Sequence, residues 1–149
     1  LLHDLILTMG ITTLLGQEMT LISIGAILTI AGYSINDTIV VFDRVREGLA
    51  TKRGDVKDVM NYSLNATLAR TLLTSVTTLV IVLVLYLFGG PALRNFSLVL
   101  IIGVLVGTYS SIFIASPIVL WWARRTGTNL RREVLDTEQA KIDPMAKPA

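Results

Sequence analysis

The chain has 149 residues, of which 52% are hydrophobic and 16% are charged, and its formal net charge is +2. This composition is too apolar for an ordinary soluble domain and is typical of a membrane protein. The small net charge gives no reason to expect nucleic acid as a partner, and the absence of cysteine excludes disulfides and thiolate chemistry.

Long uncharged stretches predict an all-α integral membrane protein, because a helix needs about 20 residues to cross the hydrocarbon core. The two longest stretches, residues 71–93 and 95–123, carry no charge at all. The first stretch is the shortest, since only residues 5–17 are uncharged, and we favour a membrane span there over a re-entrant segment. The predicted membrane helices are, in chain order, about 1–15, 19–43, 68–88 and 94–123.

Two further segments are predicted outside the membrane. Apolar side chains recur at helical spacing at about 55–67, which indicates an amphipathic helix on the membrane surface. The tail, residues 126–149, is polar and ends in KIDPMAKPA, so we expect it to be disordered. The chain begins at Leu1 without a signal peptide, and we expect it to be a piece of a longer protein.

The basic residues predict the orientation in the membrane. Short cytoplasmic loops carry an excess of lysine and arginine, so the connection 44–70 and the region after the last span, which includes the tail, should both be cytoplasmic. All the basic residues except Arg94 fall in these two regions: Arg44, Arg46, Lys52, Arg53, Lys57 and Arg70 in the first, and Arg124, Arg125, Arg131, Arg132, Lys141 and Lys147 in the second.

Small residues predict where the helices pack, because close approach of two backbones drives helix association in lipid. Gly103, Gly107 and Ser111 follow one another at intervals of four and share one face of the last span. Gly25 and Gly32 are seven residues apart and share a face of the second span. We interpret both sets as packing surfaces.

An aspartate interrupts the second apolar run. Asp37 lies one or two turns inside the charged end of that run, too deep for its short side chain to reach the surface. A carboxylate at the centre of a membrane helix costs roughly 2.5 to 3.5 kcal/mol, so Asp37 should face protein or water. Tyr33, Asn36 and Val40 share its helix face, and the first two form a predicted polar shell.

Arg70 is the predicted partner of Asp37. It opens the third span on the same side of the membrane, and Thr74, one turn further on, is the third member of the predicted polar shell. If the two side chains form an ion pair between helices, a small motion that separates them would change the protonation state of Asp37, as in the proton relays of transporters. Two other interpretations remain open: the pair only holds two helices together, or Arg70 reaches lipid phosphates.

Other residues with reactive side chains are few. His3 and Asp4 lie at the start of the first span. The sequence fits two interpretations of them equally well: a solvated helix start and a functional site. No nucleophile with an adjacent base and no metal-binding cluster is present. We therefore expect no enzyme activity and no metal or cofactor, with protons as the only coupling ion.

The stretch GYSINDTIVVFDRVRE, residues 32–47, resembles the signature of the SecF family of protein-export membrane proteins. Three other segments are similar to membrane helices of the same family: LLHDLILTMG, SLNATLARTLLTSVTTL and VLIIGVLVGTYSSIFIASPIVLW. The resemblance covers about residues 1–125. It implies a six-helix transmembrane bundle of the resistance, nodulation and division (RND) type, of which this chain would hold a four-helix fragment.

The resemblance also implies a function. A SecF protein, or the SecF half of a fused SecDF, works in the bacterial cytoplasmic (inner) membrane with SecD and the SecYEG channel. It would couple the proton-motive force to translocation of a preprotein, with Asp37 and Arg70 at the positions of the family's proton-relay groups. The alternatives are a proton-coupled RND-type exporter of small molecules and a passive membrane scaffold subunit.

Overall fold

A computed structural model describes residues 1–52, 54–127 and 129–142, and in this part of the chain every regular element is an α-helix. This confirms the predicted all-α fold. The helices are α1 (Leu2–Leu14), α2 (Leu21–Thr51), α3 (Val56–Phe88), α4 (Gly90–Phe113), α5 (Ala115–Thr126) and α6 (Leu130–Ile142).

Three helical segments are long and apolar enough to span a membrane: α2, α3 and the combined length of α4 and α5. The segment predicted at about 1–15 forms α1, which has 13 residues. At 1.5 Å per residue α1 is about 20 Å long, less than the roughly 30 Å of the hydrocarbon core. Within the described residues, α1 is therefore an apolar helix too short to span the membrane by itself.

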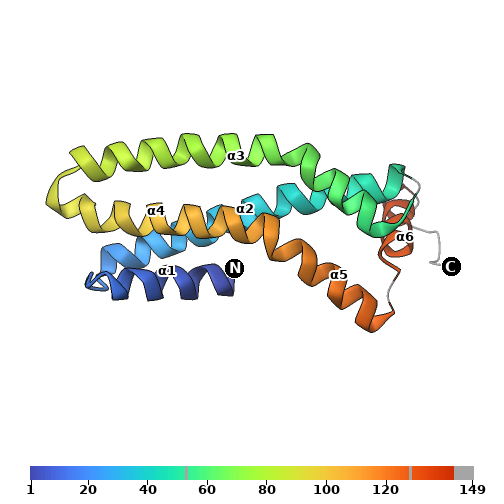
Figure 1. Ribbon diagram of the computed structural model, residues 1–149, viewed down its shortest axis with the longest axis horizontal. Helices are drawn as coiled ribbons and strands as arrows, with labels where there is room; N and C mark the ends of the chain where they lie inside the picture. The colour runs from blue at the N-terminus through green and yellow to red at the C-terminus, as the bar shows by residue number, and fades with distance from the viewer. Residues whose placement is uncertain (53, 128, 143–149) are drawn as a thin grey trace.

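The helices form an elongated bundle with α4 at its centre (Figure 1). Helix α4 packs against α1, α2 and α3, while α2 also packs against α3. Helices α1 and α2 form one hairpin and α3 and α4 another, and Asn95 joins the two by donating to the carbonyl of Glu18 at 3.0 Å. A buried apolar cluster lies where the hairpins meet, made of Ala26, Ile30, Val82, Val99 and Leu100.

The predicted surface helix at about 55–67 is not a separate element, because it forms the first part of α3. The segment contains no proline or glycine after Gly54 that would end the helix before the membrane span. Its buried side chains also continue without a break along one face: Val59, Met60, Ser63, Thr67, Thr71 and Ser75. A single helix therefore runs from the charged end of the molecule into the bundle.

The predicted last span is divided at Ile114. Pro117 lies four residues after Phe113, and its ring excludes a regular helical hydrogen bond to the carbonyl of that residue. Helix α4 therefore ends at Phe113, and α5 leaves the bundle at an angle to α4 (Figure 1). The predicted start is also corrected, because α4 begins at Gly90 with Pro91 in its first turn.

The tail contains a helix where disorder was predicted, so that prediction is wrong for Leu130–Ile142; residues 143–149 lie outside the described residues. Helix α6 packs against the end of α2. Arg131 donates from Nε to the carbonyl of Leu49 at 3.3 Å and from Nη2 to that of Lys52 at 2.9 Å. The polar composition of the tail gave no indication of this contact, in which an arginine side chain donates hydrogen bonds to carbonyl groups at the end of another helix.

The predicted glycine surface on α4 packs against α2. A Cβ atom added at Gly103 would overlap the side chain of Ile30, and one added at Gly107 would lie 3.7 Å from the Cβ of Ser34. Ser111 is only 1% exposed. These three small residues therefore let α2 and α4 approach closely.

The second predicted packing surface, at Gly25 and Gly32, is not formed within the described part of the chain. A Cβ atom added at Gly25 or Gly32 would meet no atom within 4 Å, and both residues are exposed. The reason is helical phase: the buried face of α2 passes through Ala26, Ile30 and Ser34, and the two glycines lie outside it.

Replacement of Gly103 should weaken the bundle more than replacement of Gly107. Gly103→Ala forces the buried Ile30 to move and should cost roughly 1 to 3 kcal/mol, because overpacking a filled core is destabilising. Gly107→Ala is the matched control, since its added methyl group has ordinary contact distance. Thermal unfolding of the purified protein in detergent measures the difference, and equal stability of the two variants would contradict this packing.

Arg131 should control how firmly α6 is held. Arg131→Ala removes two hydrogen bonds to α2, each worth about 1 kcal/mol for a partly exposed group, so amide exchange in α6 should accelerate roughly thirtyfold. Arg132→Ala is the control, because that side chain is exposed and has no recorded contact. Hydrogen exchange read by mass spectrometry measures this, and unchanged protection in Arg131→Ala would show that apolar contacts alone hold α6.

Candidate functional site

The candidate site lies on the buried face of α2. Buried residues recur along this helix at intervals of three and four, which is the pattern of one continuous helix face. They are Ser23, Ala26, Ile30, Ser34, Asp37, Val41, Val45, Gly48 and Leu49. Asp37 is one of them and is 5% exposed, so it faces protein, as its cost in lipid predicts.

Asp37 has no partner in the described part of the chain. Its Oδ2 atom is buried and makes no hydrogen bond, and none of the ion pairs there includes this residue. Burying an ionised carboxylate without a partner costs several kcal/mol. A proton bound to the group, or a cation placed beside it, would remove this cost.

Arg70 does not pair with Asp37 in this structure. Its side chain is exposed on α3 and forms no ion pair with any described residue. The buried face of α3 passes through Thr67, Thr71 and Ser75, and Arg70 lies about 100° around the helix from Thr71. The sequence placed both groups near one side of the membrane, but it could not fix the rotation of α3.

The predicted polar shell is divided between two surfaces. Tyr33 is half-buried, and its hydroxyl lies 3.0 Å from Oγ of Ser75, which lies 2.7 Å from Oγ1 of Thr108. These hydroxyls connect α2, α3 and α4 across the bundle. Asn36 and Thr74 are exposed, and Thr74 donates to backbone carbonyls of its own helix, so neither belongs to the surroundings of Asp37.

Asp4 is a buried carboxylate whose environment the sequence left undecided. It is 1% exposed, and the hydroxyl of Ser34 donates to its Oδ2 at 2.5 Å. The sequence contained a signal for this, because Asp4, Thr8 and Thr12 recur at intervals of four on an otherwise apolar helix, and both threonines are fully buried. A polar stripe on an apolar helix indicates a polar interior surface.

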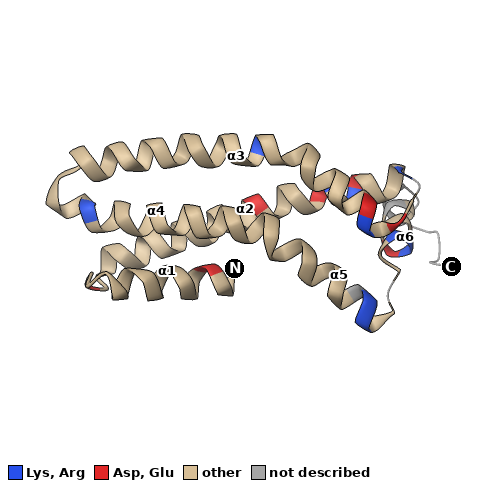
Figure 2. Ribbon diagram, in the orientation of Figure 1, with Lys and Arg blue, Asp and Glu red and all other residues tan. Residues whose placement is uncertain are grey.

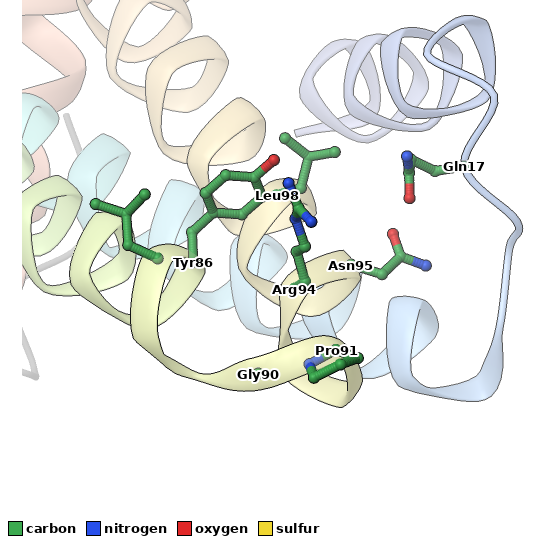
Figure 3. A pocket seen from close by; sticks show the side chains of 8 residues that line it. Gln17, Tyr86, Gly90, Pro91, Arg94, Asn95 and Leu98 are labelled. Carbon is green, nitrogen blue, oxygen red and sulfur yellow. The ribbon is translucent and has the colours of Figure 1, made fainter.

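A cleft of about 600 Å³ lies at the turn between α3 and α4 (Figure 3). Arg94 lies in it with its guanidinium 5.3 Å from the centre of the Tyr86 ring. The other lining residues are Gln17, Leu87, Gly90, Pro91, Asn95 and Leu98. The cleft contains no acidic side chain, and the described residues hold no group of three histidine or acidic side chains that could bind a metal.

Comparisons with known proteins give consistent matches. The family described as "Protein export membrane protein SecD/SecF, C-terminal" matches residues 1–125. Protein translocase subunit SecF of Desulfurispirillum indicum is 50% identical over 129 residues, covering 84% of this chain and 41% of that protein. Its counterpart in Haemophilus influenzae is 54% identical over 119 residues, covering 79% of this chain and 37% of that protein.

A solved structure gives the same result. The crystal structure of SecDF, a translocon-associated membrane protein from Thermus thermophilus, matches 82% of this chain and 17% of its own, with a TM-score of 0.78 and 46% identity. The chain thus spans less than half the length of each of these relatives.

Proposed function

The chain belongs to the SecD/SecF C-terminal family of protein export membrane proteins, and we propose that it is the membrane part of a SecF-type subunit that couples the proton-motive force to preprotein translocation. One observation carries the coupling step: Asp37 is buried in the bundle and has no partner among the described residues. The names of the relatives support the assignment to protein export.

Asp37 is the proposed proton-binding group. With a proton bound, the carboxyl group of Asp37 is neutral, so its burial in the bundle no longer carries the cost of an unpaired charge. Loss of the proton makes this arrangement costly until a cation comes near. We assign that role to Arg70, so that α2 and α3 shift relative to each other as the proton binds and leaves.

The exposed position of Arg70 also supports a contact with another protein in the membrane. Arg70 shares one exposed face of α3 with Thr74 and Thr77, at intervals of four and three. A charged and hydroxyl-bearing face is costly against lipid, so it fits a protein surface. We propose that membrane helices of SecD cover this face, and that SecYEG and the preprotein are the further partners.

The distribution of charge supports the proposed orientation in the bacterial inner membrane. Charged residues gather at the end of the bundle where α6 lies (Figure 2). That end carries the end of α2, the start of α3 and α6, whereas Arg94 lies near the start of α4, beside the turn from α3 (Figure 3). The positive-inside rule places the end with α6 in the cytoplasm.

Asp37→Asn in the full-length complex should reduce export to the level found without a proton gradient, because the amide has nearly the same shape but carries no exchangeable charge. Asp43→Asn is the matched control, since Asp43 is an exposed carboxylate on the same helix. Export driven by an imposed gradient, at equal protein levels, is the measurement. Unimpaired gradient-driven export by Asp37→Asn would favour a passive scaffold and reject the proposal.

The exposed face of α3 is tested by cross-linking. Thr74→Cys should link to a cysteine on a membrane helix of SecD, because it lies on the polar face with Arg70. Val76→Cys is the control: Val76 is 54% exposed but lies about 160° further around the helix from Thr74. Equal linking at both positions would show that SecD does not select this face.

A further inference from the structure

The carboxylate of Asp4 is held between three helices. It is 1% exposed, and the polar side chains around it come from each helix packed there. Ser34 of α2 donates to Oδ2 at 2.5 Å, and the buried Ser110 of α4 lies near the carboxylate. His3 of α1 places Nδ1 3.1 Å from Oδ1. A side chain this buried with this many donors is a built site and not a frayed helix start.

The charges that face Asp4 are few. The His3 side chain, which neighbours Asp4 on α1, is 42% exposed. No lysine or arginine side chain pairs with Asp4 in the described part of the chain. On α2 the titratable residues nearest Ser34 along the helix are Tyr33 and Asp37, and Tyr109, next to Ser110 on α4, is 57% exposed.

Hydroxyl partners suit both protonation states of a carboxyl group. A serine hydroxyl can donate to an ionised carboxylate, and after rotation it can accept from a protonated one. An arginine partner could only donate, and would hold the group in its ionised form. His3 is the one partner that is partly exposed, and an imidazole can pass a proton to or from a buried acid.

Asp4 is connected to Asp37 through α2. Ser34 and Asp37 are three residues apart on the buried face, so they are neighbours one turn apart. The hydroxyl-bearing surface continues beyond Asp37, where Oγ1 of Thr38 lies 3.5 Å from Oγ of Ser111. A change at Asp4 that turns or shifts Ser34 therefore acts on the same helix segment as the proton at Asp37.

From this geometry we infer that Asp4 is a second proton-binding carboxylate of the chain, which exchanges its proton through His3 and acts on Asp37 through Ser34. The inference deepens the proposed function and rests on it. It extends the site from one helix to a polar seam between α1, α2 and α4, which we define by Asp4, Ser34 and Ser110.

The test is infrared difference spectroscopy of the full complex between high and low pH, which detects the C=O band of a protonated carboxyl group. Asp4→Asn keeps the shape and a hydrogen-bonding group, so helix packing should persist while one such band is lost. Gradient-driven export should also change its pH dependence. A band pattern and pH profile identical to those of the wild type would overturn the inference and leave Asp4 as a structural residue.

A second variant keeps the test decisive if Asp4→Asn does not fold. Ser34→Ala removes the shortest hydrogen bond to Asp4 and leaves the carboxyl group in place, so the frequency of the assigned band should shift. Thr13→Val is the control, because Thr13 is on the exposed side of α1 and bonds only to its own helix. An unshifted band in Ser34→Ala would overturn the inference.

The outcomes separate this inference from the proposed function. Infrared bands report proton binding at Asp4 whether or not the complex exports protein. If Asp37→Asn loses gradient-driven export but Asp4→Asn behaves as wild type, only the role of Asp4 fails. If Asp37→Asn exports normally, the proposed function fails and the Asp4 band still shows whether that group binds a proton.

Discussion

The close packing of α2 on α4 is the constraint on which the rest of the structure depends. It is possible because α4 presents Gly103 to Ile30 and Gly107 to Ser34. Lipid offers no hydrophobic drive for two helices to associate, so contact between small residues must supply the attraction through close packing. The same contact excludes lipid from the face of α2 that carries Ser34 and Asp37, and this makes a buried acid possible there.

Polar groups inside this packed region obtain their hydrogen bonds in two different ways. Most hydroxyls donate to backbone carbonyls of their own helix, as Thr8 does to Asp4 and Ser111 to Gly107. Such bonds satisfy the donor locally and leave the helix free to pack. The two aspartates have no such local solution, because a carboxylate needs donors or a proton. Asp4 takes donors from neighbouring helices, while the Oδ2 atom of Asp37 has none.

The sequence predicted the fold class and the burial of Asp37 for sound physical reasons. Uncharged length indicates membrane helices, and the cost of a carboxylate in lipid indicates that it faces protein. The positions where helices end were harder to predict from the sequence. Pro117 ends α4 one turn earlier, at Phe113, and the 55–67 segment contains no helix-breaking residue, so it continues into the membrane helix. Helix α6 could not be recognised, since its attachment depends on carbonyls at the distant end of α2.

Pairing between helices was the least predictable feature, because it depends on the rotation of each helix about its axis. Arg70 is adjacent in sequence to the buried Thr71, yet one residue is 100° of rotation, and this is enough to place it on the exposed face. The exposed position of Arg70 limits how it can reach the site. A cation that lies outside the bundle can approach Asp37 only if α3 turns, or if a helix from another chain carries a charge to it.

Movement at the two aspartates would reach the charged end of the molecule through continuous helices. Helix α2 runs unbroken from Leu21 to Thr51, so a rotation at Ser34 and Asp37 also moves Val45 and Leu49, which pack against Val59 and Met60 of α3. Arg131 attaches α6 to the last carbonyls of the same helix. The break before Pro117 separates this end from α4. Helix α4 can therefore keep its glycine contacts with α2 while α5 and α6 follow a movement of α2, which makes the break the natural place for the bundle to bend.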